Sequence, residues 1–294
     1  MEEVLRTSLH TTTLTARGGV AAGGCISNGR SYQTDNGTVF IKHNTKPETR
    51  SMFEGEYASL DALYSTHTVT VPKPIKVFPD GSGSGWFFAM EHLEMTGRSK
   101  YQESLGEQLA KLHLHNISLR GTDAFVSEFG FPCPTSCGLI PMPNHWTHSW
   151  IEFYITKRLE PQVALTEGGG ETEARILLDK LKQKIPAMFE GLEVVPSLLH
   201  GDLWSGNFDE TDDYPVVFDP ASFYGHHEFD LAITRMFGGF DGKFYDAYHK
   251  LIPKSPGFAT RHKLYILFHY LNHWNHFGGG YRSQAISLLQ ELSL

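Results

Sequence analysis

The sequence predicts an α+β protein with two lobes, and three observations support this. Strand and turn signals fill the first third of the 294-residue chain, and helical periodicity dominates the remainder. Strands followed by helices favour a sheet and a helical layer that are segregated from each other. Apolar residues make up 40% of the chain and charged residues 20%, an ordinary globular composition. We expect a small β-rich lobe at residues 1–92 and a larger, mainly helical lobe at residues 93–294.

The first lobe is predicted to consist of strands, tight turns and one helix. Asn36-Gly37 is a hairpin signal, because both residue types tolerate positive φ. Residues 38–42 (TVFIK) follow as a β-branched strand. Pro47 predicts the first turn of a helix that continues through residues 53–64. An extended stretch, a turn and an apolar strand complete the lobe at residues 69–77, 80–85 and 86–90.

Helical periodicity begins near Leu93. Leu105, Leu109 and Leu112 recur at i, i+4 and i+7, which indicates one buried helix face. Two more helices are predicted further along the lobe, with a surface loop between them. The helices cover residues 146–158 and 171–184, and the loop covers residues 166–170.

The overall charge and the lack of long apolar runs exclude several classes of protein. The formal net charge is −8, which argues against nucleic acid or an anionic membrane as the main partner. No apolar run approaches the roughly 18–20 residues that span a bilayer. Residues 1–10 carry Glu2 and Glu3 and lack the basic and apolar regions of a signal peptide. We therefore expect a cytoplasmic protein.

The cysteines do not form a disulfide framework. There are three, Cys25, Cys133 and Cys137, and an odd, low number is not typical of a disulfide scaffold. No CxxC pair is present, which argues against a zinc site built on paired cysteines.

The strongest functional signal is a polar loop that follows an apolar strand. Residues 198–207 read LLHGDLWSGN, so that Asn207 follows Asp202 by five positions, and Asp219 ends the next apolar stretch. Phosphoryl transfer needs a carboxylate beside the attacking hydroxyl and oxygen ligands for the metal ions that neutralise the phosphates. Turn residues of these types are common, but their combination predicts that Asp202 is the base and that Asn207 and Asp219 bind Mg²⁺.

Upstream of this loop, a lysine and a glutamate have the spacing expected of a phosphate anchor. Lys42 ends the strand VFIK, and Glu56 lies fourteen residues further on, in a predicted helix. Glu54 is the other candidate partner, but its side chain should point about 200° away around that helix. We expect Lys42 to bind the ATP phosphates and Glu56 to position it.

Two further segments are candidates for nucleotide contacts. The glycine-rich residues 16–28, with Gly24 and Cys25, have the composition of a phosphate-covering turn, although neither G-x-G-x-x-G nor a Walker motif is present. Residues 88–93 (FAMEHL) fit an edge strand that passes into a hinge. Main-chain groups of Met90, Glu91 and Leu93 would hold adenine there. Together these features predict a protein-kinase-like fold that uses ATP and Mg²⁺.

The segment after Asp219 differs from that of a protein kinase. It has neither the DFG glycine nor an A-P-E motif, and only about ten residues separate Asp219 from Asp230, which looks like the start of a helix. Aminoglycoside and choline kinases share this compressed form. Asp230 is expected to cap that helix or to brace the catalytic loop.

Longer strings resemble the fructosamine-3-kinase (ketosamine-3-kinase) family over nearly the whole chain. They include GCIS, MFEGE, HGDLW, FDPASFYGH, MFGGF and LFHYLNHWNHFG. The resemblance implies phosphorylation of the sugar O3 in ketosamine adducts on small amines or protein lysines, after which the unstable product releases the amine. It gives Asp202, Asn207, Asp219, Lys42 and Glu56 the roles stated above. The preference among fructosamines, ribulosamines and psicosamines stays open.

Histidines and tryptophans mark a possible substrate pocket. His269, His273 and His276 share one helix face and could bind a metal, but core or substrate-lining positions are favoured, since no H-E-x-x-H is present. We hypothesise that His273 and Trp274, with Trp204 beside the base, line the ketosamine pocket.

Cys25 has two interpretations. It is either a small residue in a glycine-rich turn or, as the resemblance implies for members with a cysteine here, a redox-active thiol that links two copies of the chain. The protein is accordingly expected to be a monomer or a disulfide-linked homodimer.

Two other functions compete with the ketosamine kinase. One is a small-molecule kinase for an aminoglycoside or a choline-like alcohol, which usually has an acidic pocket for a cationic substrate. The other is a non-catalytic scaffold that binds nucleotide. The scaffold is disfavoured because Lys42, Asp202, Asn207 and Asp219 are all present.

Overall fold

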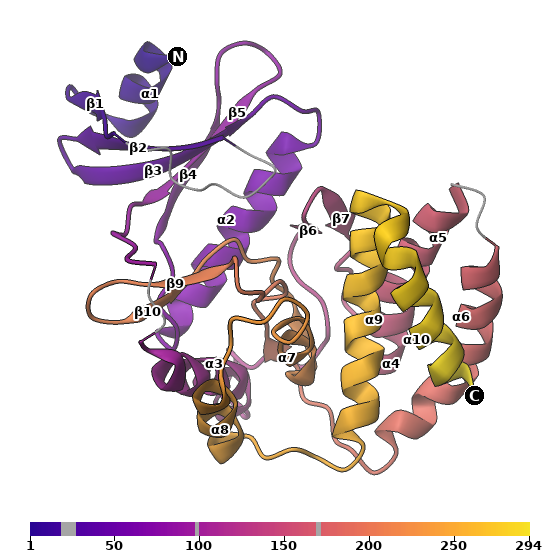
Figure 1. Cartoon of the computed structure of the whole chain (residues 1–294). Coiled ribbons are helices and arrows are strands. Elements are labelled where there is room, and N and C mark those ends of the chain that lie inside the picture. Colours follow the sequence, from indigo (N-terminus) through magenta and orange to yellow (C-terminus); the bar gives the residue numbers. More distant parts are fainter. Residues whose placement is uncertain (19–27, 98–99, 169–171) are drawn as a thin grey trace.

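The computed structural model describes residues 1–18, 28–97, 100–168 and 172–294. It shows a sheet-containing lobe and a larger helical lobe (Figure 1). Gly24 and Cys25 lie outside the described residues. The last strand of the sheet ends at Glu91 and the next helix begins at Gln102. The boundary we place between residues 92 and 93 stays a prediction.

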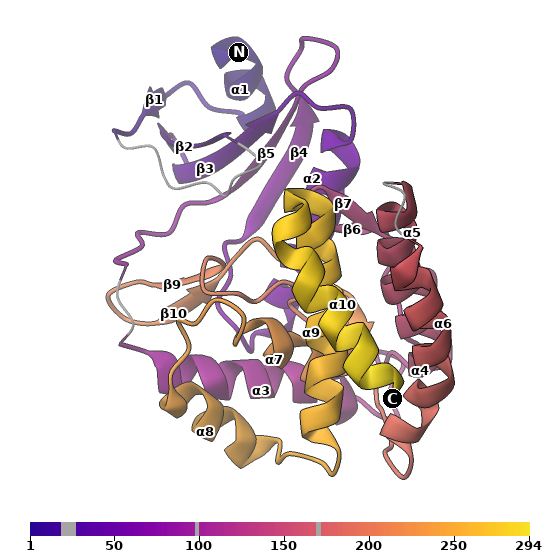
Figure 2. The same cartoon turned by 45° about the vertical axis from the view of Figure 1, so that its right-hand side comes forward.

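The small lobe contains a five-stranded antiparallel sheet in the order β1-β2-β3-β5-β4. Helix α2 crosses one side of this sheet, as two views of the molecule show (Figures 1 and 2). The elements of the lobe are α1 (Glu2–Leu9), β1 (Leu14–Ala16), β2 (Asn28–Thr34), β3 (Gly37–Asn44), α2 (Thr49–Thr66), β4 (Pro74–Pro79) and β5 (Trp86–Glu91).

The hairpin between β2 and β3 lies one residue earlier than the sequence predicts. Thr34 pairs with Gly37, so Asp35 and Asn36 form the two-residue loop. Gly37 has φ of 108° and begins β3, and a glycine adopts that conformation without steric cost. The register places Lys42 between Gly29 of β2 and Phe88 of β5.

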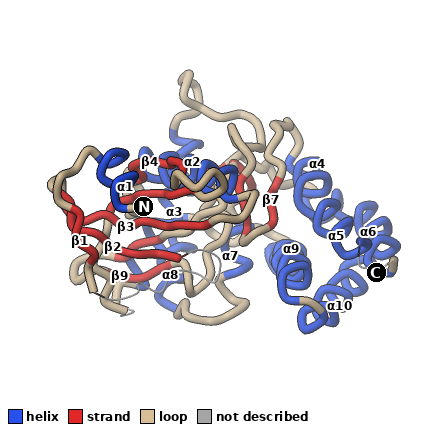
Figure 3. The backbone as a smooth tube through the Cα atoms, turned by 90° about the horizontal axis from the view of Figure 1, so that it is seen from above, coloured by secondary structure: helices blue, strands red, loops and turns tan. Residues whose placement is uncertain are grey.

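The second lobe is mainly helical and also contains short strands (Figure 3). Its first half contains α3 (Gln102–Ser118), β6 (Thr135–Cys137), β7 (Ile140–Met142), α4 (Trp150–Tyr154), the π-helix η1 (Ile155–Leu159), α5 (Glu160–Gly168), α6 (Glu173–Lys184) and η2 (Ile185–Phe189). Its second half contains β8 (Ser197–Leu198), β9 (Phe208–Glu210), β10 (Pro215–Val217), β11 (Tyr224–Gly225), α7 (Glu228–Ile233), α8 (Gly242–Leu251), α9 (Phe258–Phe277), η3 (Gly279–Tyr281) and α10 (Arg282–Ser293).

The helix predicted at residues 146–158 is longer than expected and begins later. It starts at Trp150, passes through the π-helical turn η1 and continues as α5 to Gly168. The predicted loop at residues 166–170 is therefore wrong at residues 166–168. Pro161 has no amide hydrogen to donate to the preceding turn, and the wider π turn accommodates this loss within a continuous helix.

Most of the core is one cluster that extends from α2 through the helical lobe. Leu105, Leu109 and Leu112 are almost fully buried in it, which confirms the predicted helix face. Within the described parts of the chain, none of the helices has the length and apolar character needed to cross a bilayer.

Helix α2 lies close to the helical lobe at Gly55. A Cβ atom on Gly55 would lie 2.6 Å from the carbonyl oxygen of Pro134 and 3.2 Å from Cα of Thr135. The backbone of α2 therefore lies directly against the β6 segment. This contact fixes the position of the helix that carries Glu56.

We predict that Gly55→Ala destabilises the protein by about 1–3 kcal/mol, because the new methyl group overlaps backbone atoms that cannot rotate away. Alanine in place of glycine in an open helix position would instead stabilise the fold. Urea denaturation measures the free energy of unfolding, and Ser51→Ala on the exposed face of α2 is the matched control. An unchanged or increased free energy of unfolding in Gly55→Ala would show that this contact does not restrain α2.

Candidate active site

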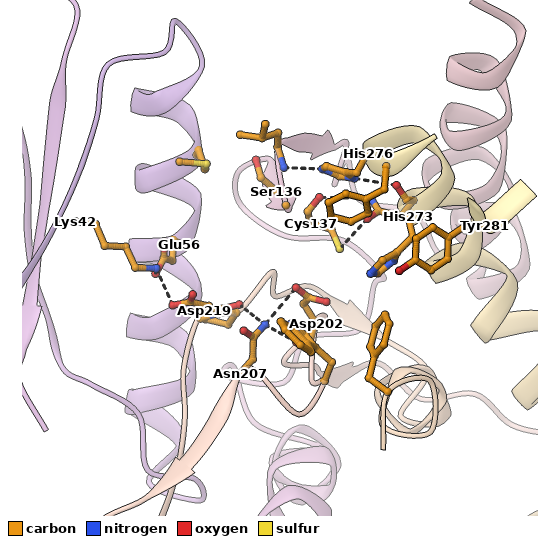
Figure 4. A pocket seen from close by; sticks show the side chains of 18 residues that line it. Lys42, Glu56, Ser136, Cys137, Asp202, Asn207, Asp219, His273, His276 and Tyr281 are labelled. Carbon is orange, nitrogen blue, oxygen red and sulfur yellow. Dashed lines mark hydrogen bonds and ion pairs between the residues drawn. The ribbon is translucent and has the colours of Figure 1, made fainter. Parts of the chain in front are cut away.

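A cavity of about 440 Å³ lies between the two lobes, and it contains the residues that the sequence singles out for catalysis. Its walls come from β3, α2, the β6–β7 hairpin, the loop after β8 and helix α9 (Figure 4). Lys42, Glu56, Asp202, Asn207 and Asp219 all line it. Segments far apart in the sequence thus meet at one site.

Lys42 forms two ion pairs, one within the small lobe and one that joins the two lobes. Its Nζ atom lies 2.6 Å from Oε1 of Glu56 and 2.7 Å from Oδ1 of Asp219. Burial alone would lower the pKa of Lys42, but the carboxylates of Asp219 and Glu56 outweigh burial and raise it above its usual value. Lys42 is therefore a cation at the junction of the lobes. Glu54 instead pairs with Arg50 on the exposed face of α2.

Asn207 connects the two aspartates of the catalytic loop. Its Nδ2 atom donates to the main-chain oxygen of Asp202 at 2.8 Å, to Oδ2 of Asp202 at 3.2 Å and to the main-chain oxygen of Asp219 at 3.5 Å. Because the nitrogen is engaged, the amide oxygen remains available to a cation. Asp219 has φ of 55°, a conformation that aspartate tolerates better than most residues. This geometry gives hard oxygen donors suited to Mg²⁺.

Asp230 braces the catalytic loop. The sequence predicts this role as one of two, the other being to cap its helix. Its carboxylate accepts hydrogen bonds from the amides of His200 at 2.7 Å and Gly201 at 2.8 Å, and His113 lies 3.1 Å away. Burial would raise the pKa of Asp230, but the hydrogen bond and charge interaction with His113 lower it. The carboxylate therefore stays ionised and fixes the loop.

Two local features fix the start of the loop. Gly201 has φ of 85°, and a Cβ atom there would lie 2.1 Å from the oxygen of Ala221, so only glycine fits. The ring of His200 accepts from the amide of Asp202 through Nδ1, at 3.3 Å, and donates through Nε2 to the oxygen of Phe218, at 3.0 Å. Burial lowers the pKa of His200, which favours the neutral ring that both bonds require.

Asp202 has the properties of a general base. Burial, reinforced by the nearby charge of Asp219, raises the pKa of Asp202 to about 7. A carboxylate that holds its proton near neutral pH is a better base than an ordinary aspartate. Its side chain points into the cavity (Figure 4), where a substrate hydroxyl could approach it.

An aromatic wall stands on the side of the cavity away from Lys42. Trp204 and Phe237 meet edge to face with ring centroids 5.6 Å apart. The ring of His273 lies 5.2 Å from that of Phe237 and 5.1 Å from that of Tyr281. Gly206 makes room for the indole, since a Cβ there would lie 2.2 Å from the Trp204 ring.

The three histidines of α9 have different environments. Nδ1 of His273 donates to the oxygen of His269 at 2.8 Å, and burial lowers the pKa of His273, so Nε2 remains an acceptor. His276 donates to the oxygen of Asn272 and accepts from the amide of Leu139 at 2.9 Å, which fixes the β6–β7 turn. His269 is fully buried. Of the three, His273 and His276 line the cavity.

Trp204 and His273 are on the wall, as hypothesised, but Trp274 is not. The Trp274 side chain is 92% buried in the core, with the Arg282 guanidinium 5.7 Å from its ring centroid. Consecutive helix residues point about 100° apart, so the turn that directs His273 to the cavity directs Trp274 away from it. We do not propose a substrate contact for Trp274.

The predicted nucleotide-hinge residues lie at the end of β5. Met90 is buried, Glu91 is exposed and its amide donates to the oxygen of Lys73, and Leu93 lies in the connection to α3. None of the three lines the cavity described here. Their contact with adenine stays a prediction, as do the roles of Gly24 and Cys25, which lie outside the described residues.

Sequence reasoning missed several wall residues. Phe237, Phe277, Tyr281, Asn272 and Cys137 all line the cavity. The strings MFGGF and LFHYLNHWNHFG contain three of them, which was a usable signal. Cys137 gave none, because its position depends on the packing of the β6–β7 hairpin against α9.

The fold and site define a class, the small-molecule kinases with a protein-kinase-like fold. The profile of the family described as fructosamine kinase matches residues 1–294. "Ketosamine-3-kinase" of Mus musculus is 50% identical over 310 residues, which cover 100% of both chains. The chain belongs to the fructosamine kinase family.

Solved structures agree with the fold. A candidate fructosamine-3-kinase from Haemophilus somnus 129PT superposes with a TM-score of 0.82 at 25% identity, and the match covers 99% of this chain and 95% of the other. An aminoglycoside phosphotransferase in a ternary complex with AMP-PNP and hygromycin B gives a TM-score of 0.64 at 14% identity, covering 100% and 97% of the two chains. At that identity the second likeness concerns the fold alone.

We predict that Asp202→Asn stabilises the ligand-free, metal-free protein above neutral pH. Folded Asp202 keeps its proton to about pH 7, whereas an unfolded aspartate loses it near pH 3.8. The folded state therefore binds more protons between these values, and wild-type stability falls as the pH rises through them. The variant escapes this loss and should gain about 1–3 kcal/mol at about pH 8.

Urea denaturation in the presence of EDTA at about pH 5, 6, 7 and 8 measures this difference in the free energy of unfolding. The advantage of Asp202→Asn should grow across the series. Asp123→Asn, at an exposed loop position, is the control and should show no such trend. A difference that stays constant across the series would mean that Asp202 ionises like an ordinary aspartate.

Proposed function

We propose that the protein transfers the γ-phosphoryl group of ATP to the 3-hydroxyl of ketosamines, and so initiates deglycation of small amines or protein lysines. The observation that carries this proposal is the position of Asp202. It lies between the polar cluster of Lys42, Asn207 and Asp219 and the aromatic wall that contains Trp204 and His273. A sugar on the wall would present a hydroxyl to the base and face the phosphate-binding groups.

The residues on the polar side fit a magnesium–nucleotide complex. The amide oxygen of Asn207 and the carboxylate of Asp219 are hard donors and would hold Mg²⁺, which neutralises phosphate charge when bound. Lys42 would anchor the α- and β-phosphates, and Glu56 keeps it in place when Asp219 turns to the metal. Asp202 would accept the proton of the attacking hydroxyl.

The aromatic side fits a sugar better than a polycationic antibiotic. Aromatic faces pack against the C–H edges of sugars, and Nε2 of His273 can accept from a sugar hydroxyl. The carboxylates among the lining residues are Glu56, Asp202 and Asp219, all within the catalytic cluster. Among the described residues, the wall thus lacks the acidic groups that an aminoglycoside or choline pocket would need. Fructosamine, ribulosamine and psicosamine all satisfy this chemistry.

The arrangement also favours an active enzyme over a nucleotide-binding scaffold. Lys42 is already paired with Glu56 and Asp219, and Asp202 is already hydrogen-bonded to Asn207. A scaffold has no need to keep a buried carboxylate with a raised pKa, because such a group costs stability.

We predict that the protein consumes ATP in the presence of Mg²⁺ and a ketosamine, and that Asp202→Asn lowers turnover by at least about 100-fold, since proton transfer contributes that much. Coupled measurement of ADP release with fructosyl-lysine, ribulosyl-lysine, psicosyl-lysine and a simple aminoalcohol ranks the substrates.

His273→Ala should raise KM for the ketosamine and leave KM for ATP unchanged. His148→Ala, at an exposed position away from the cavity, is its control.

Turnover of the aminoalcohol in preference to every ketosamine would move the assignment to another alcohol kinase. Binding of nucleotide without turnover of any acceptor would favour the scaffold. An unchanged KM for ketosamine in His273→Ala would remove His273 from the substrate contacts.

We also propose that Cys25 provides the thiol for a redox-linked homodimer. The family resemblance supports this. The raised pKa values of the other two thiols support it as well, because they make those thiols poor alternatives. Burial raises the pKa of Cys133, and burial with the nearby Asp202 carboxylate raises that of Cys137. A thiol is oxidised through its thiolate, so Cys133 and Cys137 are poor candidates for intermolecular oxidation.

Mild treatment with a thiol oxidant should therefore give a dimer on a non-reducing gel for the wild type and for Cys133→Ser. Cys25→Ser should remain monomeric on the same gel. A dimer that persists in Cys25→Ser would assign the crosslink to another cysteine.

A further inference from the structure

Three side chains with metal-binding atoms, Asp202 among them, meet at the edge of the cavity. Sγ of Cys137, a carboxylate oxygen of Asp202 and a ring nitrogen of His269 all lie within 4.8 Å of one another. They come from the end of β6, the catalytic loop and helix α9. Cys137 and Asp202 lie near each other (Figure 4), and both line the cavity.

His269 has an unusual environment for a buried histidine. Its side chain is fully buried, yet neither ring nitrogen has a hydrogen-bond partner within the part of the chain that the structure describes. A buried polar group without a partner costs about 1–3 kcal/mol, so such groups usually have a role that explains them. Burial lowers the pKa of His269 to about 3, which keeps the ring neutral with a lone pair available.

The chemistry of the three groups is that of a zinc site. Thiolate, imidazole and carboxylate are the usual protein ligands of Zn²⁺, and three of them with an open fourth position are typical of accessible sites. A point equidistant from three atoms 4.8 Å apart lies about 2.8 Å from each, so shifts of about 0.5–0.8 Å would give Zn–ligand distances of about 2.0–2.3 Å. The cavity supplies room for a water ligand.

We propose that Cys137, His269 and Asp202 form an inhibitory Zn²⁺ site at the catalytic base. On binding, the Cys137 thiol loses its proton to solvent and a sulfur–zinc bond forms, with no change in oxidation state. The sulfur distinguishes this site from the Asn207–Asp219 pair, whose oxygen donors suit Mg²⁺.

The inhibition follows from the shared carboxylate and rests on the proposed function, whereas the metal site itself does not. A carboxylate that coordinates Zn²⁺ cannot accept the proton of a substrate hydroxyl. The metal also lies where that hydroxyl would approach Asp202. Zinc should therefore compete with the ketosamine and not with ATP, whose anchors lie on the other side of the cavity.

Titration of the full-length protein with Co²⁺, a spectroscopic substitute for zinc, tests the site directly. One equivalent should produce a thiolate-to-cobalt charge-transfer band that Zn²⁺ abolishes. The band should be absent in Cys137→Ser and present in Cys133→Ser. In His269→Gln the apparent affinity for Co²⁺ should fall more than about tenfold. Circular dichroism confirms that each variant is folded, and Cys137→Ala replaces Cys137→Ser if the latter is not.

A wild-type protein without the band, or a band that persists without the Cys137 thiol, would overturn the proposal. In the kinase assay, Zn²⁺ should inhibit the wild type and Cys133→Ser, a chelator should restore activity, and Cys137→Ser should be at least about tenfold less sensitive. Zinc sensitivity that is equal in Cys137→Ser and wild type would also contradict it.

The two proposals fail in different ways. A cobalt band without turnover of any ketosamine would leave the metal site standing and remove the proposed function. Ketosamine turnover in a protein that gives no cobalt band would support the proposed function and remove the metal site.

Discussion

The ion pair of Lys42 with Asp219 joins the two lobes, its ion pair with Glu56 holds the lysine against helix α2, and the rest of the active site depends on them. Loss of the Lys42 cation would leave two carboxylates facing each other without a partner, at a cost of about 3–5 kcal/mol. Helix α2 is further restrained by Gly55 and by Ser59, whose hydroxyl accepts from the amide of Ser222 at 3.1 Å. The active arrangement is thus built into the packing, and a long activation segment is unnecessary.

Two buried aspartates of the catalytic region have opposite properties because their surroundings differ. Asp230 receives two amide hydrogens and a histidine, so it is ionised and holds the loop. Asp202 is desolvated by burial and lies near the carboxylate of Asp219, so its pKa rises. Two carboxylates whose pKa values are pushed apart in this way are typical of sites of acid–base chemistry.

The order of strands and helices, and the meeting of Asp202 with Asn207 and Asp219, could be predicted because each follows from local spacing. Helix geometry alone separated Glu56 from Glu54. The position of Trp274 could not be predicted in this way. Tertiary packing sets the rotation of α9 about its axis, and this rotation directs the Trp274 side chain into the core. Cys137 lines the cavity because it belongs to the β6–β7 hairpin, which is held by a hydrogen bond to His276 of helix α9. The continuation of α5 past Thr166 likewise depends on packing against α6 and α9.

The central claim is that Asp202 directs phosphoryl transfer to one hydroxyl of a ketosamine. NMR identification of the product formed from fructosyl-lysine tests this most directly. The account predicts one phosphomonoester on O3 for each ATP consumed, followed by release of free lysine. Phosphate on another hydroxyl, or ATP hydrolysis that leaves the sugar unmodified, would contradict it.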